Sequence, residues 1–131
     1  EQGFRYRGSA FQAAEGTVLR TEFRLTPGDP AEIRARMQDL AQRRRSKQPL
    51  ELPSAGSAFK RPEGHYAGAL IEAAGLKGFR IGGAAVSEKH AGFVVNLGGA
   101  TAADVRALLA AVQQRVFEQS GVMLEPEIRL L

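Results

Sequence analysis

The sequence predicts an α+β fold, in which helices pack on a sheet. Three observations predict it. Residues 17–25 alternate between apolar and polar side chains, which is typical of a half-buried strand. Residues 105–116 carry apolar side chains at helical spacing. Short apolar runs at 79–86, 93–97 and 123–131 complete the order strand–helix, then helix–strand–strand–helix–strand, which is typical of helices layered on one sheet.

The first half of the chain contains one predicted strand and one predicted helix. A turn at 26–28 ends the strand, and Asp29 then provides a helix cap, with Pro30 at the first helical position. The helix is expected to end at about Ser46. Residues 47–53 are expected to be extended, because each proline there disfavours helical geometry in the residue before it. The apolar side chains at helical spacing in this helix are Ile33, Met37, Leu40 and Ala41.

The second half contains the remaining elements. Residues 66–74 form a predicted short helix that Gly75 ends. The strand predicted at 79–86 contains two glycines, which indicates that something approaches its backbone closely. Thr101 and Asp104 have the spacing of a capping box at the start of the long helix, in an acidic variant of that motif.

Composition limits the class of protein. The chain has 131 residues, enough for one domain, or for one small domain and a piece of another. Its 44% hydrophobic content supports a packed core, and no apolar run approaches the ~20 residues of a membrane span. The absence of cysteine excludes disulfides and thiolate metal sites, and His65 has no second ligand at metal-binding spacing. No signal-peptide pattern opens the sequence, so we expect a cytoplasmic protein with no metal and no membrane partner.

Positive charge is concentrated in one part of the sequence. The formal net charge is +4, and eight cations lie between Arg34 and Arg61 against two acids. Such a cluster can face nucleic acid, a membrane surface or a phosphorylated ligand, or it can be a solvated helix face. No aromatic residue lies between Phe23 and Phe59, which weakens the hypothesis of single-strand nucleic-acid binding.

Three separated segments form one pattern. Residues 53–64 read PSAGSAFKRPEG, residues 4–11 read FRYRGSAF, and residues 124–129 read LEPEIR. Together with KQP at 47–49 and VSEKHAGF at 86–93, they resemble the UDP-N-acetylenolpyruvoylglucosamine reductase family, in its shorter form. The resemblance runs from Phe4 to the last residue and covers only the C-terminal part of that enzyme.

The resemblance implies two parts and one reaction. Residues 1–50 would be the C-terminal tail of an FAD-binding domain, and residues 51–131 the α+β substrate-binding domain. The reaction would reduce UDP-N-acetylglucosamine enolpyruvate to UDP-N-acetylmuramate, a peptidoglycan precursor, with FAD as cofactor and NADPH as co-substrate. No glycine-rich strand–turn–helix of the expected spacing supports flavin binding by this chain itself. We therefore expect the flavin to be held mainly elsewhere, and the isolated chain, a monomer, to have no turnover.

The implied chemistry assigns roles to three residues. The family reaction adds a hydride to the vinyl carbon of the enolpyruvyl ether, and the charge left behind requires a proton donor. Ser57 matches the family's proton-donating serine, although a Gly-Ser pair taken alone is more typical of a turn. Glu127 matches the active-site glutamate; strand alternation would point Glu125 the same way, so only the resemblance chooses between them. Arg7 matches the arginine that meets the substrate carboxylate with two parallel hydrogen bonds.

Six further residues are expected to bind substrate. They are Arg44, Lys47, Gln48, Lys60, Arg61 and His90. The first three are implied to lie near the diphosphate, where arginine offers a fork of donors and lysine a mobile point charge. The next two flank Ser57. The histidine stands where relatives place a glutamine close to the uridine, although a lone histidine is more often a structural hydrogen-bonding residue.

Two other functions fit the same residues. One is a small basic nucleic-acid-binding domain that uses residues 43–47, and it predicts binding that weakens steeply with salt. The other is a non-catalytic nucleotide-sugar-binding module, which would bind UDP compounds without turnover. We favour the reductase hypothesis, with UDP-N-acetylglucosamine enolpyruvate as the partner and no nucleic acid.

Overall fold

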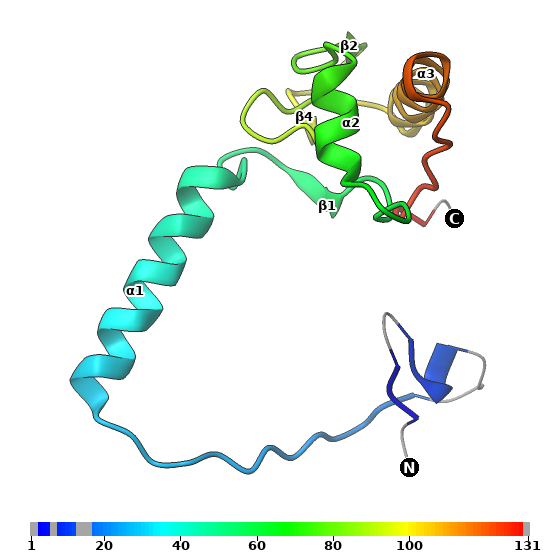
Figure 1. The fold of residues 1–131 in the computed structure, drawn as a ribbon. Coiled ribbons are helices and arrows are strands. Elements are labelled where there is room, and N and C mark those ends of the chain that lie inside the picture. Colours follow the sequence, from blue (N-terminus) through cyan, green and yellow to red (C-terminus); the bar gives the residue numbers. More distant parts are fainter. Residues whose placement is uncertain (1–2, 6–7, 13–16, 130–131) are drawn as a thin grey trace. The chain divides into compact units, whose positions relative to one another are not determined.

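The computed structural model describes residues 3–5, 8–12 and 17–129. These residues fall into two compact units, Glu1–Ile33 and Arg34–Leu131. Every sheet strand found among the described residues belongs to the second unit, together with the two helices that pack on the sheet (Figure 1). The second unit therefore contains the sheet and its packed helices, and it defines the fold.

The first unit contains little regular structure. Arg5 and Gly8 exchange backbone hydrogen bonds of 3.0 Å, and a 3-10 helix, η1, spans Ala10–Gln12. The strand predicted at 17–25 is wrong, because these residues form no strand and are exposed along their length. A strand requires a neighbour to share its backbone hydrogen bonds, and no described segment pairs with this one.

α1 spans Pro30–Lys47, close to the predicted bounds. Asp29 caps it as predicted, since its Oδ1 accepts hydrogen bonds of 2.9 Å from the backbone N–H groups of Ala31 and Glu32. No side chain of α1, all of which is described, is buried, so its apolar stripe is exposed. The extended segment predicted at 47–53 is wrong: it is a turn closed by backbone hydrogen bonds of 2.9 and 3.2 Å. Each proline restricts only the residue before it, which leaves the residues between free to turn.

The second unit is a four-stranded antiparallel sheet with helices packed on it (Figure 1). Its strands are ordered β1-β4-β3-β2. The elements are β1 (Ser54–Ser57), α2 (Ala67–Ala73), β2 (Arg80–Ile81), β3 (Ala84–Val86), β4 (Phe93–Asn96) and α3 (Ala102–Ser120). The predicted α+β class is confirmed.

Two predicted strands differ from the observed structure. The strand predicted at 79–86 is a hairpin, β2 and β3, because the glycine pair in its middle makes a turn. The strand predicted at 123–131 is wrong: within the described residues it forms a single bridge, between Pro126 and Phe59. Proline has no N–H to continue a ladder, and here the hydrogen bonds come from the residues on either side of it.

The core lies between the sheet and the two helices. α3 begins at the predicted capping box: the Asp104 N–H donates to Thr101 Oγ1 at 3.1 Å, and the Thr101 N–H donates to Asp104 Oδ2 at 2.9 Å. The predicted close approach to the glycine pair is confirmed, since a Cβ on Gly83 would lie 2.4 Å from the backbone nitrogen of Ala100. The stripe of α3 that is buried in this core consists of Leu108, Leu109, Val112 and Val116.

The turn after α1 covers the opposite face of the sheet. Ala85 and Val95 are 3% and 2% exposed, but they are not part of the core between the sheet and the helices. Pro49 and Leu52 line a pocket of about 250 Å³ with them. Both faces of the sheet are therefore covered, one by helices and the other by a short turn.

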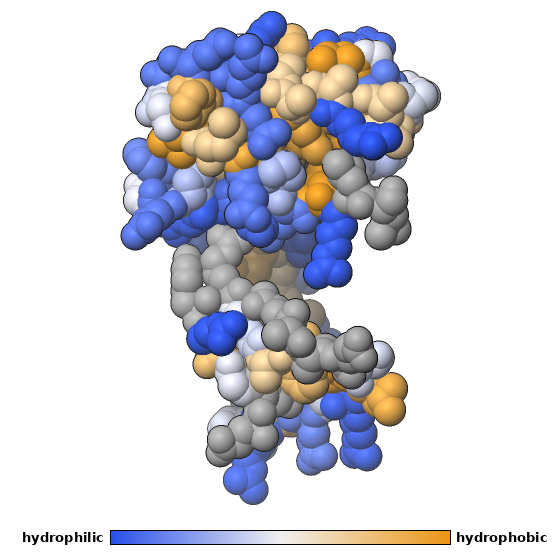
Figure 2. Space-filling view, turned by 90° about the vertical axis from the view of Figure 1, so that its right-hand side faces the viewer, coloured by the Kyte–Doolittle hydropathy of each residue, from blue (hydrophilic) through white to orange (hydrophobic). Residues whose placement is uncertain are grey.

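The surface mixes polar and apolar residues. Figure 2 shows hydrophilic and hydrophobic residues interspersed on one face. Exposed large apolar side chains include Phe117 and Met123. In the part of the chain that the structure describes, no helix is both long enough and apolar enough to cross a membrane.

Candidate functional site

Ser57 ends β1 at an irregular point of the strand. Ser54 pairs with Val95 and Ser57 with Phe93, so the stretch on β1 has one residue more than its partner stretch on β4. Such a β-bulge re-aims the side chains next to it. Gly56, within the bulge, adopts a φ of 88°, which residues with a side chain rarely adopt. Ser57 itself is exposed, so its hydroxyl is accessible to a ligand.

Ala58, which is 1% exposed, ties two other segments to the end of β1. Its N–H donates to the carbonyl of Gly92 at 2.8 Å, and its carbonyl accepts from the N–H of Glu127 at 2.9 Å. The loop that contains His90 leads directly into Gly92. The structure therefore gathers around Ser57 the segments that carry Glu127 and His90, although these residues are far apart in the sequence.

A pocket of about 540 Å³ lies beside Ser57 and is called the Ser57 pocket below. Its lining includes Arg44, from the last turn of α1, and Gln48, which follows the helix. Arg44 Nε donates to Gln48 Oε1 at 3.0 Å, which orients the guanidinium through one of its five N–H groups. Lys47 is the exposed last residue of α1. Arg44, Gln48 and Ser57, which come from two separate segments, thus line one pocket.

His90 is held by its own loop. Its Nδ1 accepts a hydrogen bond of 3.0 Å from the Gly92 N–H, and its ring meets Phe93 edge to face with centroids 5.0 Å apart. The neutral ring then carries its proton on Nε2, which is a donor. The buried hydroxyl of Ser87 accepts from the N–H groups of Lys89 and His90, at 3.1 and 3.3 Å. The loop therefore presents a histidine in a fixed orientation.

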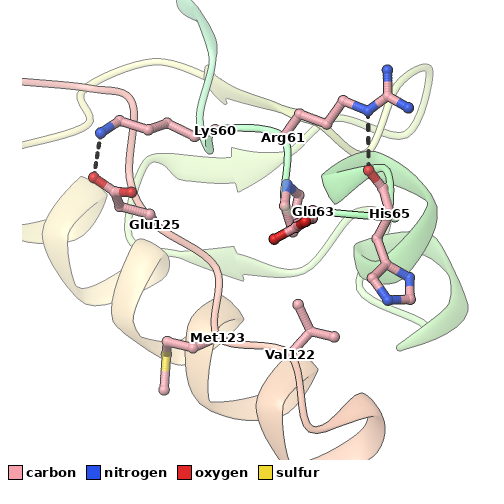
Figure 3. A pocket seen from close by; sticks show the side chains of 8 residues that line it. Lys60, Arg61, Glu63, His65, Val122, Met123 and Glu125 are labelled. Carbon is pink, nitrogen blue, oxygen red and sulfur yellow. Dashed lines mark hydrogen bonds and ion pairs between the residues drawn. The ribbon is translucent and has the colours of Figure 1, made fainter.

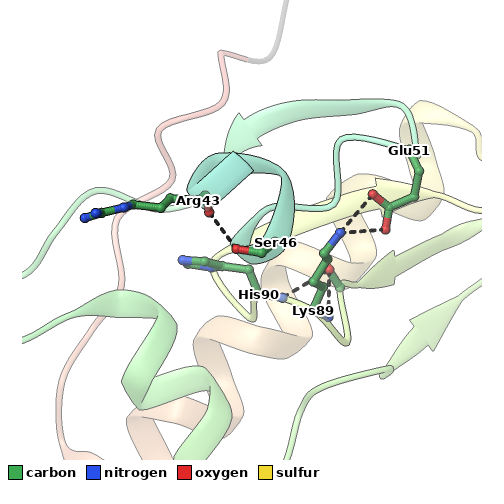
Figure 4. A network of polar contacts seen from close by, with 6 residues as sticks. Arg43, Ser46, Glu51, Lys89 and His90 are labelled. Carbon is green, nitrogen blue, oxygen red and sulfur yellow. Dashed lines mark hydrogen bonds and ion pairs between the residues drawn. The ribbon is translucent and has the colours of Figure 1, made fainter. Parts of the chain in front are cut away.

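An ion pair that no sequence pattern predicts joins this loop to the turn after α1. Lys89 Nζ lies 3.2 Å from Glu51 Oε2 (Figure 4). The backbone N–H of Glu51 itself, and then the Lys89 ammonium, hold the pKa of the Glu51 carboxyl below its usual value. The two residues are 38 positions apart, so only the folded chain brings them together.

Lys60 and Arg61 line a second pocket, of about 450 Å³ (Figure 3). Lys60 forms an ion pair with Glu125. The guanidinium of Arg61 lies 3.9 Å from the centroid of the Tyr66 ring, and its Nε donates to a backbone carbonyl of the same loop at 3.2 Å. Both cations are thus engaged locally, and neither is among the described residues that line the Ser57 pocket.

Residues 48–131 match the family profile described as UDP-N-acetylenolpyruvoylglucosamine reductase, C-terminal domain. The chain belongs to this family. A relative of that name from Exiguobacterium sibiricum is 54% identical over 96% of this chain and 41% of its own length. Another, from Levilactobacillus brevis, is 54% identical over 100% of this chain and 43% of its own length. The crystal structure of UDP-N-acetylenolpyruvylglucosamine reductase (MurB) from Thermus caldophilus matches with a TM-score of 0.76 at 40% identity, over 98% of this chain and 46% of that one.

The chain therefore spans less than half of the length of these MurB relatives. The predicted resemblance to the reductase family is confirmed for this part. Arg7, which the sequence assigns to the substrate carboxylate, lies outside the described residues. The site in this MurB domain is consequently described without it.

The glycine pair before α3 is the candidate that the sequence offers for the phosphates of the expected FAD, and its surroundings do not suit them. Gly98 and Gly99 precede α3, as a dinucleotide-binding turn would. However, the helix N-terminus is already occupied by the Asp104 carboxylate, which accepts from the Thr101 N–H at 2.9 Å. A diphosphate placed there would be repelled by this carboxylate. Within the described ranges, no three metal-ligating side chains cluster either.

Proposed function

We propose that this chain is the substrate-binding part of a reductase that converts UDP-N-acetylglucosamine enolpyruvate into UDP-N-acetylmuramate, a precursor of peptidoglycan. The observation that carries the proposal is the pocket that Ser57 shares with Arg44 and Gln48. Residues 51–131 are proposed as the substrate-binding domain, and residues 1–50 as the tail of a domain that binds FAD, with NADPH as the reductant. The family profile begins at residue 48, which supports this boundary. A cytoplasmic monomer is part of the same proposal.

The chemistry of the Ser57 pocket suits the diphosphate of a nucleotide sugar. Arg44 offers a planar fork that can donate two parallel hydrogen bonds to phosphate oxygens. Lys47, on the same helix end, adds a mobile positive charge, and Gln48 adds an amide. His90 Nε2 is a donor on a fixed ring, which suits recognition of a uracil carbonyl. The pocket volume of about 540 Å³ lies in the usual range of small-molecule sites.

The proposed chemical role of Ser57 is to donate a proton. After a hydride has added to the vinyl carbon, the negative charge is shared between the neighbouring carbon and the carboxylate. This enediolate is a strong base, so a serine hydroxyl is acidic enough to protonate the carbon. The β-bulge, the exposure of Ser57 and its place in the lining of the pocket support this role. Glu127 is proposed to polarise the substrate from the neighbouring segment, with Arg7 on the substrate carboxylate.

Titration of UDP-N-acetylglucosamine into this chain, followed by amide NMR, tests the pocket. The expected result is a set of shifts centred on Arg44, Gln48 and Ser57, with smaller ones at Lys60 and Arg61, which line the second pocket. The absence of shifts around Gln48 at millimolar ligand would contradict the proposal. Shifts produced by an oligonucleotide instead, and abolished by salt, would favour the nucleic-acid alternative.

Substitution Ser57→Ala in a full-length reductase carrying this chain tests the catalytic role. Flavin reduction by NADPH should remain nearly normal, and reduction of the enolpyruvyl substrate should slow by ~10²–10⁴-fold, as expected when an acid catalyst is lost. Rapid mixing of reduced enzyme with substrate separates the two half-reactions. A variant that forms product at the normal rate would remove Ser57 from the mechanism, and a wild-type protein that binds UDP compounds without turnover would indicate a non-catalytic module.

Glu127→Gln and Glu125→Gln form a matched pair for the glutamate. The first should lower turnover more than substrate affinity, and the second should be much milder, because Glu125 already forms an ion pair with Lys60. Turnover and KM of both variants rank them. If Glu125→Gln were the more damaging, the assignment of Glu127 would be wrong, whereas the assignment of Ser57 would stand.

A further inference from the structure

Besides the apolar side chains of Pro49 and Leu52, two polar contacts link the turn after α1 to the sheet and its loops. At its end, the Asn96 N–H donates to the Pro53 carbonyl at 2.9 Å. At its apex, Lys89 Nζ lies 3.2 and 3.4 Å from the two carboxylate oxygens of Glu51. The backbone of Lys89 is held in place, because the buried Ser87 hydroxyl accepts its N–H at 3.1 Å. The ion pair therefore joins this surface turn to the loop that also carries His90.

The start of the same turn carries residues of the Ser57 pocket. The Gln48 N–H donates to the Arg44 carbonyl at 2.9 Å, and Arg44 Nε donates to Gln48 Oε1 at 3.0 Å. These two side chains are thus coupled to each other and to the turn. A shift of the turn away from the sheet would move both of them away from Ser57.

We propose that the Glu51–Lys89 ion pair is a positioning contact, which keeps the turn on the sheet and thereby holds Arg44 and Gln48 beside Ser57. Neither partner is among the described residues that line the Ser57 pocket, so the contact acts through other residues. It should change the affinity for a nucleotide sugar and leave the chemical step unchanged. This expectation about the ligand rests on the proposed function, whereas the positioning itself does not.

The chain offers a closely matched control. The Lys77–Glu72 pair has side chains that are 36% and 59% exposed, against 34% and 60% for Lys89–Glu51. Lys77 follows α2, and its partner lies on that helix, so this pair does not join the turn to the sheet. Exposed pairs contribute little to stability, so effects of about 2- to 5-fold are expected. A comparison of Lys89→Met with Lys77→Met separates positioning from the general loss of a surface ion pair.

The first measurement needs no ligand. In Lys89→Met, the amide protons of Leu52 and Asn96 should exchange about 2- to 5-fold faster, and the Gln48 amide resonance should shift. Lys77→Met should change none of these. The double reversal Glu51→Lys with Lys89→Glu should restore the wild-type rates. Equal exchange rates in the two methionine variants would overturn the proposal.

The second measurement is calorimetric titration with UDP-N-acetylglucosamine. Lys89→Met should weaken binding by about 2- to 5-fold, and Lys77→Met should leave it unchanged. Faster exchange without weaker binding would overturn the link between the turn and the Ser57 pocket. A wild-type chain that binds no ligand would overturn the proposed function, while the exchange rates and the Gln48 shift would still decide whether the ion pair positions the turn.

Discussion

α1 and α3 are helices of almost equal length, 18 and 19 residues, with opposite surroundings. Both begin at side-chain caps, provided by Asp29 in one case and by Thr101 with Asp104 in the other. Four side chains of α3 are buried, whereas α1, which is described throughout, buries none. A side-chain cap thus sets where each helix begins, whereas the burial of its apolar side chains depends on whether other elements pack against it. The stability of α1 therefore rests on local interactions, and that of α3 on packing.

The largest difference between the helices should come from truncating one apolar side chain in each. Leu108→Ala in α3 should lower the free energy of unfolding by about 2–5 kcal/mol, because Leu108 is completely buried and its loss leaves a cavity. Leu40→Ala in α1 should change it by no more than about 0.5 kcal/mol, because Leu40 is 54% exposed. Urea unfolding of both variants measures the two values. Similar losses would show that α1 packs against something in this chain.

The glycines near the two helix starts offer a second comparison. Gly83→Ala should cost about 1–3 kcal/mol, because the new Cβ would lie 2.6 Å from the Gly98 carbonyl, and backbone of that loop cannot move aside cheaply. Gly28→Ala, just before α1, should be nearly neutral, since the nearest atom is the flexible end of Ile33 at 3.3 Å. Thermal unfolding of the two variants checks this order. A mild Gly83→Ala would mean that the hairpin is not packed tightly against the loop before α3.

Removal of the capping side chains should change the free energy of unfolding less than the core and glycine substitutions do, and differently in the two helices. Thr101→Ala should lower the free energy of unfolding of the second unit by about 0.5–2 kcal/mol. Asp29→Ala should instead increase fraying of the first turn of α1, and leave that free energy unchanged. Amide exchange in each first turn, measured beside urea unfolding, distinguishes local fraying from global loss. A global loss in Asp29→Ala would contradict the local character of α1.

Acid should weaken the start of α3. The Thr101 backbone N–H, then the Thr101 hydroxyl, hold the pKa of Asp104 below the usual 3.8. Because the folded pKa is the lower one, the contribution of Asp104 is complete above the unfolded value and is lost as pH falls through the folded value. Urea midpoints from about pH 2 to about pH 7 should therefore show a difference between wild type and Asp104→Asn that shrinks in acid. A constant difference would mean that the carboxylate charge does not contribute.

The features that could be predicted from the sequence are those set by neighbouring residues, such as the caps of the two helices. Features that need a distant partner could not. Local signals predicted local features correctly: Asp29 as a cap, the Thr101–Asp104 box, and the spacing of the buried stripe on α3. Strands depend on partners that the sequence does not specify. The alternation at 17–25 has no described partner, and Pro126 limits the last segment to a single bridge.

The site shows the same division. The sequence pattern marked Ser57, Arg44 and Gln48, and the structure brings them to one pocket. The pattern also predicted Lys60 and Arg61 beside Ser57. In the structure they line a second pocket, with Glu125 and Tyr66 as their partners. Contacts between distant residues are absent from any local pattern. A feature that could have been foreseen is the bulge in β1, because a glycine inside a strand often marks a bulge, and Gly56 stands inside β1.

The bulge in β1 also bears on how copies of this chain meet one another. β1 lies at the edge of the four-stranded sheet, and edge strands can accept a further strand from another molecule. A second copy could extend the sheet only by matching a regular run of backbone donors and acceptors. The extra residue between Ser54 and Ser57 breaks that run within a strand of four residues. The irregularity next to Ser57 therefore also disfavours the sheet-to-sheet aggregation to which an exposed edge is prone.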